Sequence, residues 1–162
     1  MKSAYRYCFK EHWATFLHYD FRIDIGNGDA LSFAINYGPS MRPNVERLAI
    51  EMPMHLSRTM FLEGRIPDGR EGAGETRVWD KGIITSDQDI RFVLRSGSWI
   101  FSIQGERLNG EFQLLLYPDK GREWALIKLP DKYAEHSFVL KTLLEPETTN
   151  LAYRHWLTEI AK

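Results

Sequence analysis

The side chains that could do chemistry are concentrated between residues 12 and 22, where the order is His12, His18, Asp20 and Arg22. On a strand, residues two apart point to the same side and lie about 6.6–6.8 Å apart along the axis, so His18 and Asp20 could approach one ion together. His12, across a bend, could supply a third ligand. Two imidazoles and one carboxylate suit a divalent transition metal such as Mn²⁺, Fe²⁺ or Zn²⁺.

Arg22 continues the same polar face. Its planar guanidinium suits a phosphate group bound beside the ion. The pattern alone leaves two other interpretations open. One is a solvated polar face that carries two incidental histidines. The other is a cupin-like oxygenase in which two histidines and a carboxylate hold Fe²⁺, although the arginine favours phosphate.

The elements that must position these residues are predicted to be strands. Polar and apolar residues alternate strictly through 18–25, which is typical of a strand with one buried and one polar face. Asn27-Gly28 predicts a tight turn, and 30–35 is predicted to be the returning strand. The pattern predicts further strands at 47–52, at 77–79 and 83–84 on either side of a turn at 80–82, and at 99–104, 112–117 and 124–129.

Short strands separated by frequent turns favour a sandwich or a closed barrel. We predict a mainly β protein in which a compact antiparallel β-barrel spans about residues 5–140. An α-helix at about 150–161 is expected to pack on the outside of the barrel. Because 162 residues suit one core, we expect 1–162 to form a single domain. The helix is predicted from apolar residues that share one face, which are Tyr153, Trp156, Leu157 and Ile160.

Composition narrows the class of protein. The 21 basic and 22 acidic residues give a net charge of −1, which argues against a broad basic surface that coats nucleic acid. Cys8 is the only cysteine, so no intrachain disulfide can form, as expected in a reducing cytoplasm. No apolar run approaches the roughly 20 residues of a membrane span, and the first residues lack the apolar stretch of a secretory signal. We therefore expect a cytoplasmic protein without a membrane partner.

The run from His12 to Arg22, HWATFLHYDFR, resembles the signature of the 3′-phosphoesterase domain of bacterial DNA ligase D and of its free-standing archaeal and bacterial relatives. That signature has a histidine followed by Leu-His-Tyr-Asp-Phe-Arg. The resemblance covers about residues 7–134, and so many ordered matches are more specific than any single motif. The further matches, in chain order, are Gly38-Pro39-Ser40, Arg47-Leu48-Ala49, His55, the glycine-rich stretch 63–74, Val78-Trp79-Asp80 with Gly82, Gly105-Glu106 with Leu108 and Gly110, and Trp124 with Leu126-Ile127-Lys128.

The resemblance implies a compact β-barrel whose cavity holds Mn²⁺, with Co²⁺ or Zn²⁺ as other ions that could bind. It implies removal of a 3′-terminal ribonucleotide, and of a 3′-phosphate, from a primer strand. The roles that it implies are metal ligation by His12, His18 and Asp20, a grip on the scissile phosphate by Arg22 and Arg47, and transition-state stabilisation or acid catalysis near the leaving group by His55.

The chain also departs from the family pattern. Lys10 stands where the family has glutamine, and Tyr37 stands where it has lysine. Leu56 and Thr59 replace a proline and a tyrosine. We hypothesise that Lys10 contacts a substrate phosphate and replaces the positive charge that is lost at Tyr37, which requires both residues to border the same cavity.

The sequence thus predicts a Mn²⁺-dependent phosphoesterase that heals DNA 3′ ends. Its partners are expected to be primer-templates or nicked and broken 3′ ends, together with a separate DNA ligase or polymerase. The alternative is a catalytically weak or silent module that binds DNA ends and assists a separate repair ligase.

Overall fold

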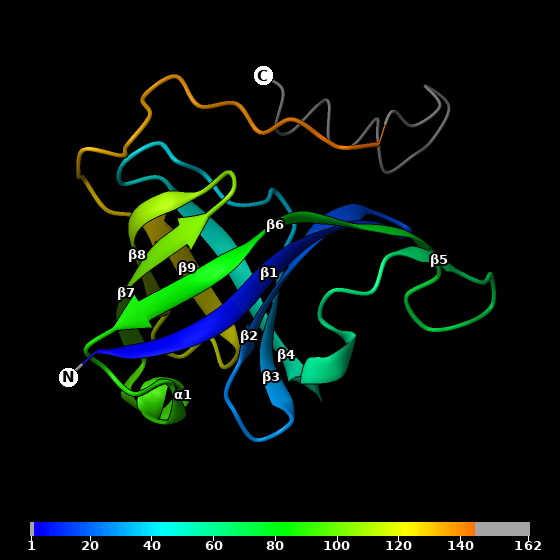
Figure 1. Ribbon diagram of the computed structural model, residues 1–162, viewed down its shortest axis with the longest axis horizontal. Helices are drawn as coiled ribbons and strands as arrows, with labels where there is room; N and C mark the ends of the chain where they lie inside the picture. The colour runs from blue at the N-terminus through cyan, green and yellow to red at the C-terminus, as the bar shows by residue number, and fades with distance from the viewer. Residues whose placement is uncertain (1, 145–162) are drawn as a thin grey trace.

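The computed structural model describes residues 2–144, which form a β-barrel (Figure 1). The prediction of a mainly β, antiparallel barrel is confirmed. The predicted helix at 150–161 lies outside the described residues. The strands are β1 (Ser3–Trp13), β2 (Leu17–Asp24), β3 (Asp29–Ile35), β4 (Glu46–Leu56), β5 (Gly64–Ile66), β6 (Gly74–Ser86), β7 (Ser98–Gly105), β8 (Asn109–Leu116) and β9 (Glu123–Lys128).

Eight strands close the barrel in the order β1-β2-β3-β4-β9-β8-β7-β6, and β6 pairs back to β1. Every pairing between these strands is antiparallel. The short strand β5 pairs with the start of β6 outside this ring. The only α-helix among the described residues is one turn, α1 (Val93–Ser96), between β6 and β7. No helix in the described part of the chain is long and apolar enough to span a membrane.

The interior of the barrel is filled with aromatic and aliphatic side chains. Phe9 of β1 and Phe21 of β2 stack with their ring centroids 4.2 Å apart. Trp99 and Trp124, from the opposite wall, are fully buried in the same core. This core occupies the interior of the barrel, and none of the predicted metal ligands belongs to it. The expected location of the metal site inside the barrel is therefore wrong, and the candidate site lies on the outer face.

One predicted turn is also wrong. Residues 80–82 were expected to form a turn, but they continue β6, which pairs with β1 along most of its length. The polar residue that suggested a turn, Asp80, is instead buried and hydrogen-bonded. Its carboxylate accepts from the Tyr7 hydroxyl at 2.7 Å and from the backbone amide of Arg107 at 2.7 Å.

The segment between β4 and β6, residues 57–73, leaves the barrel and forms a projecting arm (Figure 1). It starts with a 3-10 turn, η1 (Ser57–Thr59), and includes β5. The thiol of Cys8, on the outer face of β1, lies against the base of this arm and donates to the carbonyl of Met60. The arm therefore covers part of the outer face of the barrel.

Candidate metal and phosphate site

The outer face of β1 and β2 carries the predicted metal ligands. In β2, His18 and Asp20 alternate with core residues, so they point away from the barrel interior. The register of the hairpin places His12 opposite His18, and Lys10 opposite Asp20. Opposite residues on neighbouring strands have Cβ atoms about 4.5–5.5 Å apart. Strand pairing alone therefore brings these four side chains together.

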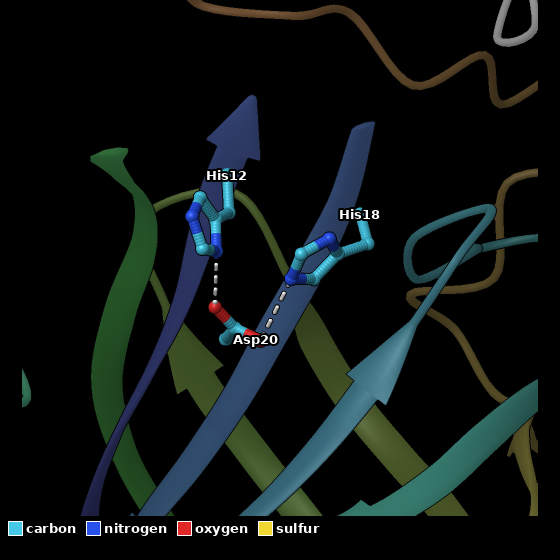
Figure 2. A group of neighbouring side chains, drawn as sticks. All are labelled: His12, His18 and Asp20. Carbon is cyan, nitrogen blue, oxygen red and sulfur yellow. Dashed lines mark hydrogen bonds and ion pairs between the residues drawn. The ribbon is translucent and has the colours of Figure 1, made fainter. Parts of the chain in front are cut away.

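His12, His18 and Asp20 form one cluster (Figure 2). His12 Nδ1 lies 3.2 Å from Asp20 Oδ2, and His18 Nε2 lies 3.2 Å from Asp20 Oδ1. One ligand atom from each residue lies within 4.8 Å of the other two. The structure thus brings together the three residues that the sequence predicted to share an ion.

Hydrogen bonds to backbone carbonyls fix the orientation of both imidazoles. His12 Nε2 lies 2.6 Å from the carbonyl oxygen of Gly72, and His18 Nδ1 lies 3.2 Å from that of Phe16. A carbonyl oxygen can only accept, so these two nitrogens carry the protons. The other ring nitrogens, His12 Nδ1 and His18 Nε2, face the carboxylate of Asp20. A lone pair and a carboxylate repel each other, so a cation is needed between them. Such carbonyl-anchored imidazoles are typical of metal ligands, so the donor set fits a divalent transition metal.

The charge state of the cluster also suits a cation. Burial alone would raise the pKa of Asp20, but hydrogen bonds from His12 and His18 outweigh burial, and the pKa of Asp20 lies well below its usual range. Burial would lower the pKa of His18, but its bond to Asp20 and the Asp20 charge raise that pKa above the usual value. The Asp20 carboxylate therefore favours a cation, whether a proton or a metal ion, at His18 Nε2.

A pocket of about 640 Å³ adjoins the cluster, between the outer face of the barrel and the arm. Arg22 and Ser32 sit opposite each other on β2 and β3, and both line this pocket. The Arg22 Nε and Ser32 Oγ atoms are buried and have no hydrogen-bond partner among the described residues. An unsatisfied buried polar group costs about 1–3 kcal/mol. The two groups are thus ready to bind an oxyanion next to the metal ligands.

Lys10 lines the same pocket and is nearly fully buried. Burial lowers its pKa, and the neighbouring Arg22 charge lowers the pKa further. A bound anion stabilises two such neighbouring cations, because it attracts both of them and offsets the hydration that Lys10 loses on burial. The predicted position of Lys10 at a phosphate site is consistent with this placement.

His55 also lines the pocket, from β4, where it lies opposite Ala30. Its Nδ1–H donates to the carbonyl of Pro53 at 2.9 Å, which leaves Nε2 for a ligand. Burial lowers the pKa of His55, and the Arg22 charge lowers it further. The imidazole is therefore neutral at pH 7 in the free protein.

Arg47 is the predicted site residue that the structure does not bring to the pocket. On β4 it lies opposite Leu126, a core residue, and on the same face as buried Ala49. Arg47 therefore points toward the barrel side of the strand. A register shift between β3 and β4 lets Met52 and His55 both face the pocket, although they are three residues apart.

The hypothesis that Lys10 replaces a charge lost at Tyr37 requires both residues to border one cavity, and Tyr37 is not among the residues that line the pocket of Lys10. Tyr37 interacts electrostatically with Arg47, at a site where burial and the Arg42 charge lower the pKa of Arg47. Lys10 instead faces Arg22 in the pocket, which Tyr37 does not line. The two positions therefore do not border the same cavity.

Two contributors to the site were missed from the sequence. Ser32 had a signal, because it is the one polar residue on the outer face of β3, between Ala30 and Ala34. Its role depends on the register that pairs it with Arg22, which the sequence does not specify. Nothing in the sequence indicated the contact of the Gly72 carbonyl with His12, because it is made by a backbone atom in a loop of the arm.

Comparison with known proteins supports these observations. The family model described as the DNA Ligase D 3′-phosphoesterase domain matches residues 10–116. The multifunctional non-homologous end joining protein LigD of Pseudomonas aeruginosa is 39% identical over 128 residues, which cover 78% of this chain and 15% of that protein. The LigD proteins of Mycolicibacterium smegmatis and Mycobacterium tuberculosis are 28% identical over 78% and 83% of this chain, and 17% of each relative is covered. The chain thus spans about a sixth of the length of these curated relatives.

Proposed function

The chain belongs to the DNA ligase D 3′-phosphoesterase domain family, and from this premise and the site geometry we propose that it is a metal-dependent hydrolase of DNA 3′ ends. It removes a 3′-terminal ribonucleotide, a 3′-phosphate, or both, and leaves a 3′-hydroxyl for a DNA ligase or polymerase. The observation that carries the proposal is that the cluster of His12, His18 and Asp20 shares one pocket with two unpartnered buried donors, Arg22 Nε and Ser32 Oγ.

The chain's own residues would bind the phosphate and hold the ion. His12, His18 and Asp20 are the proposed metal ligands, and Mn²⁺ is the ion that we propose for them. Arg22 and Ser32 donate to the non-bridging oxygens, where hydrolysis accumulates negative charge. A bound divalent ion would supply further charge stabilisation and a more acidic water molecule.

His55 is the proposed proton donor to the leaving group. His55 is neutral in the free protein, but a bound phosphate favours the imidazolium, so the His55 ring takes up a proton when the substrate phosphate binds. During hydrolysis the oxygen of a water molecule forms a bond to phosphorus, and a proton of that water passes to solvent. The bond from phosphorus to the 3′-oxygen breaks, and this oxygen takes the proton from His55. We do not assign Arg47 a contact with this phosphate, because it lies away from the pocket.

Gel analysis of end-labelled primer-templates tests the proposal. One substrate ends in a single ribonucleotide and another ends in a 3′-phosphate, and each is incubated with the protein and Mn²⁺. We expect both to be converted to a 3′-hydroxyl product, and we expect His18→Ala to abolish conversion. His136→Ala is the matched control, because His136 is exposed and does not line the pocket.

Two outcomes would contradict the proposal. If the unchanged protein binds these ends but converts none of them, the chain is a DNA-end-binding module. If His18→Ala converts them at the normal rate, the reaction does not use this cluster.

A further inference from the structure

The pocket has an aliphatic side next to its charged side. Met52 of β4 and Leu62 of the arm both line it. They are nevertheless 39% and 61% exposed, and Leu62 is the most exposed large apolar side chain among the described residues. Ligand pockets typically combine apolar lining residues with a few well-placed polar groups, so this pocket suits a ligand that has both a charged and an apolar part.

Strand register places this aliphatic surface beside the candidate phosphate site. Ser32 lies opposite Arg22 on one side and opposite Met52 on the other. Neighbouring strands are about 4.8 Å apart. A phosphate held by Arg22 and Ser32 therefore has Met52 within one strand spacing, close enough to contact a group esterified to that phosphate.

The chemistry of the wall indicates which feature of that group it recognises. None of the described residues that line the pocket is Phe, Tyr or Trp, so the wall is not an aromatic stacking platform. The side chains of Met52 and Leu62 have no strong hydrogen-bonding group, so they cannot read the donors and acceptors on a base edge. They can cover the apolar face of any base.

We propose that Met52 and Leu62 form the seat of the 3′-terminal nucleoside, and that this seat recognises the presence of a base but not its identity. The inference rests on the proposed function and names the part of the substrate that the pocket contacts beyond the phosphate. A nucleotide fits both sides of the pocket, because its phosphate satisfies Arg22 and its base covers Leu62. An apolar protein surface would cover the leucine and leave the buried Nε of Arg22 without a hydrogen-bond partner.

Oligonucleotides that end in a 3′-phosphate test this seat. Their terminal nucleoside carries one of the four bases or is abasic, and hydrolysis is compared in the unchanged protein, Met52→Ser and Leu62→Ser. Leu115→Ser is the matched control, because Leu115 is 40% exposed on β8 and does not line the pocket. We expect the two pocket variants to raise KM for base-bearing ends about three- to tenfold. On the abasic end, the pocket variants and the unchanged protein should have equal KM.

The four bases should give KM values within about twofold of one another, because the wall offers no base-edge contacts. Equal losses on the abasic and base-bearing ends, or no loss on either, would overturn the nucleoside seat while the phosphoesterase function stands. If the unchanged protein hydrolyses neither a 3′-phosphate end nor an end with a single ribonucleotide, the proposed function fails. The same comparison by fluorescence anisotropy then tests the seat alone. A loss of affinity only for base-bearing ends supports it, and equal affinities in all variants overturn it.

Discussion

Replacing Gly72 by alanine tests whether the backbone of the arm helps to hold the metal ligand His12. Gly72 has a φ of +73°, a left-handed conformation that costs other residues roughly 1–2 kcal/mol. A Cβ at this position would lie 3.4 Å from His12 Cε1 and 3.7 Å from Ile66 Cδ1, which are ordinary contacts. The alanine side chain therefore fits, and the cost falls on the backbone. Relief of that strain moves the carbonyl that accepts from His12 Nε2 at 2.6 Å.

The size of the effect follows from the role of this carbonyl. Loss of a hydrogen-bond partner of a metal-binding histidine typically lowers metal affinity about 10- to 100-fold, which is about 1.4–2.8 kcal/mol. We expect a loss of this size for Mn²⁺ in Gly72→Ala, measured by isothermal titration calorimetry. Co²⁺ absorption spectra should also change, because the His12 ring is no longer held in one orientation.

Gly69→Ala separates this effect from general strain in the arm. Gly69 has a φ of +85°, and a Cβ there would meet no atom within 4 Å. This variant carries the same backbone cost without a bond to a ligand, so we expect its Mn²⁺ affinity to change less than about twofold. Equal affinities in Gly72→Ala and the unchanged protein, or an equal loss in both alanine variants, would refute the reasoning.

Four further outcomes are expected. Asp20→Asn should lose Mn²⁺ binding and hydrolysis. Asp24→Asn should keep both, because Asp24 is on the same strand but does not line the pocket. Retained turnover in Asp20→Asn would contradict the proposed role of Asp20 as a metal ligand. Arg22→Lys should lower kcat/KM on a 3′-phosphate end about 100-fold, because an ammonium cannot reproduce the planar donor pair, and a loss below about threefold would argue against this contact. Burial and the Arg22 charge lower the pKa of His55, and bound phosphate raises this pKa, so affinity for inorganic phosphate should increase as pH falls through the ordinary value of 6.5. Calorimetry in two buffers should detect proton uptake on phosphate binding, and His55→Gln should remove this uptake. Proton uptake that persists in His55→Gln would exclude His55 as the group that is protonated. The logarithm of affinity for a recessed 3′ end should fall with the logarithm of salt concentration with a slope of about −2 to −4, and a slope of about −8 would reveal a larger basic surface.

The outer face of β2 could be predicted from the sequence because its alternation is strict. Buried Tyr19 and Phe21 fix which side of the strand faces the core, so His18 and Asp20 must face away from it. The Asn27-Gly28 turn also fixed the direction of the next strand. Local pattern was therefore enough to predict which face of β2 carries His18 and Asp20, and the resemblance to the family added the closed barrel and the third ligand, His12.

The parts that could not be predicted depend on long-range register and on loops. Arg47 faces the barrel side because of its pairing with β9, a partner about 80 residues away. The local pattern of Asp, Lys and Gly at 80–82 favours a turn. Strand β6 continues through these residues because the Asp80 carboxylate accepts hydrogen bonds from Tyr7 and from the backbone of Arg107. The Gly72 carbonyl reaches His12 through the arm, and no periodicity describes that path. The location of the pocket outside the barrel likewise depends on how tightly the aromatic core fills the interior.

The most direct test of the central claim measures Mn²⁺ occupancy and 3′-phosphate hydrolysis in the same samples. Metal-free protein is titrated with Mn²⁺, bound metal is determined by calorimetry, and phosphate release from a 3′-phosphate primer is measured at each point. The account predicts that the rate rises in proportion to one bound ion per chain and returns to background in excess chelator. Hydrolysis at full rate in chelator, or full occupancy without phosphate release, would contradict it.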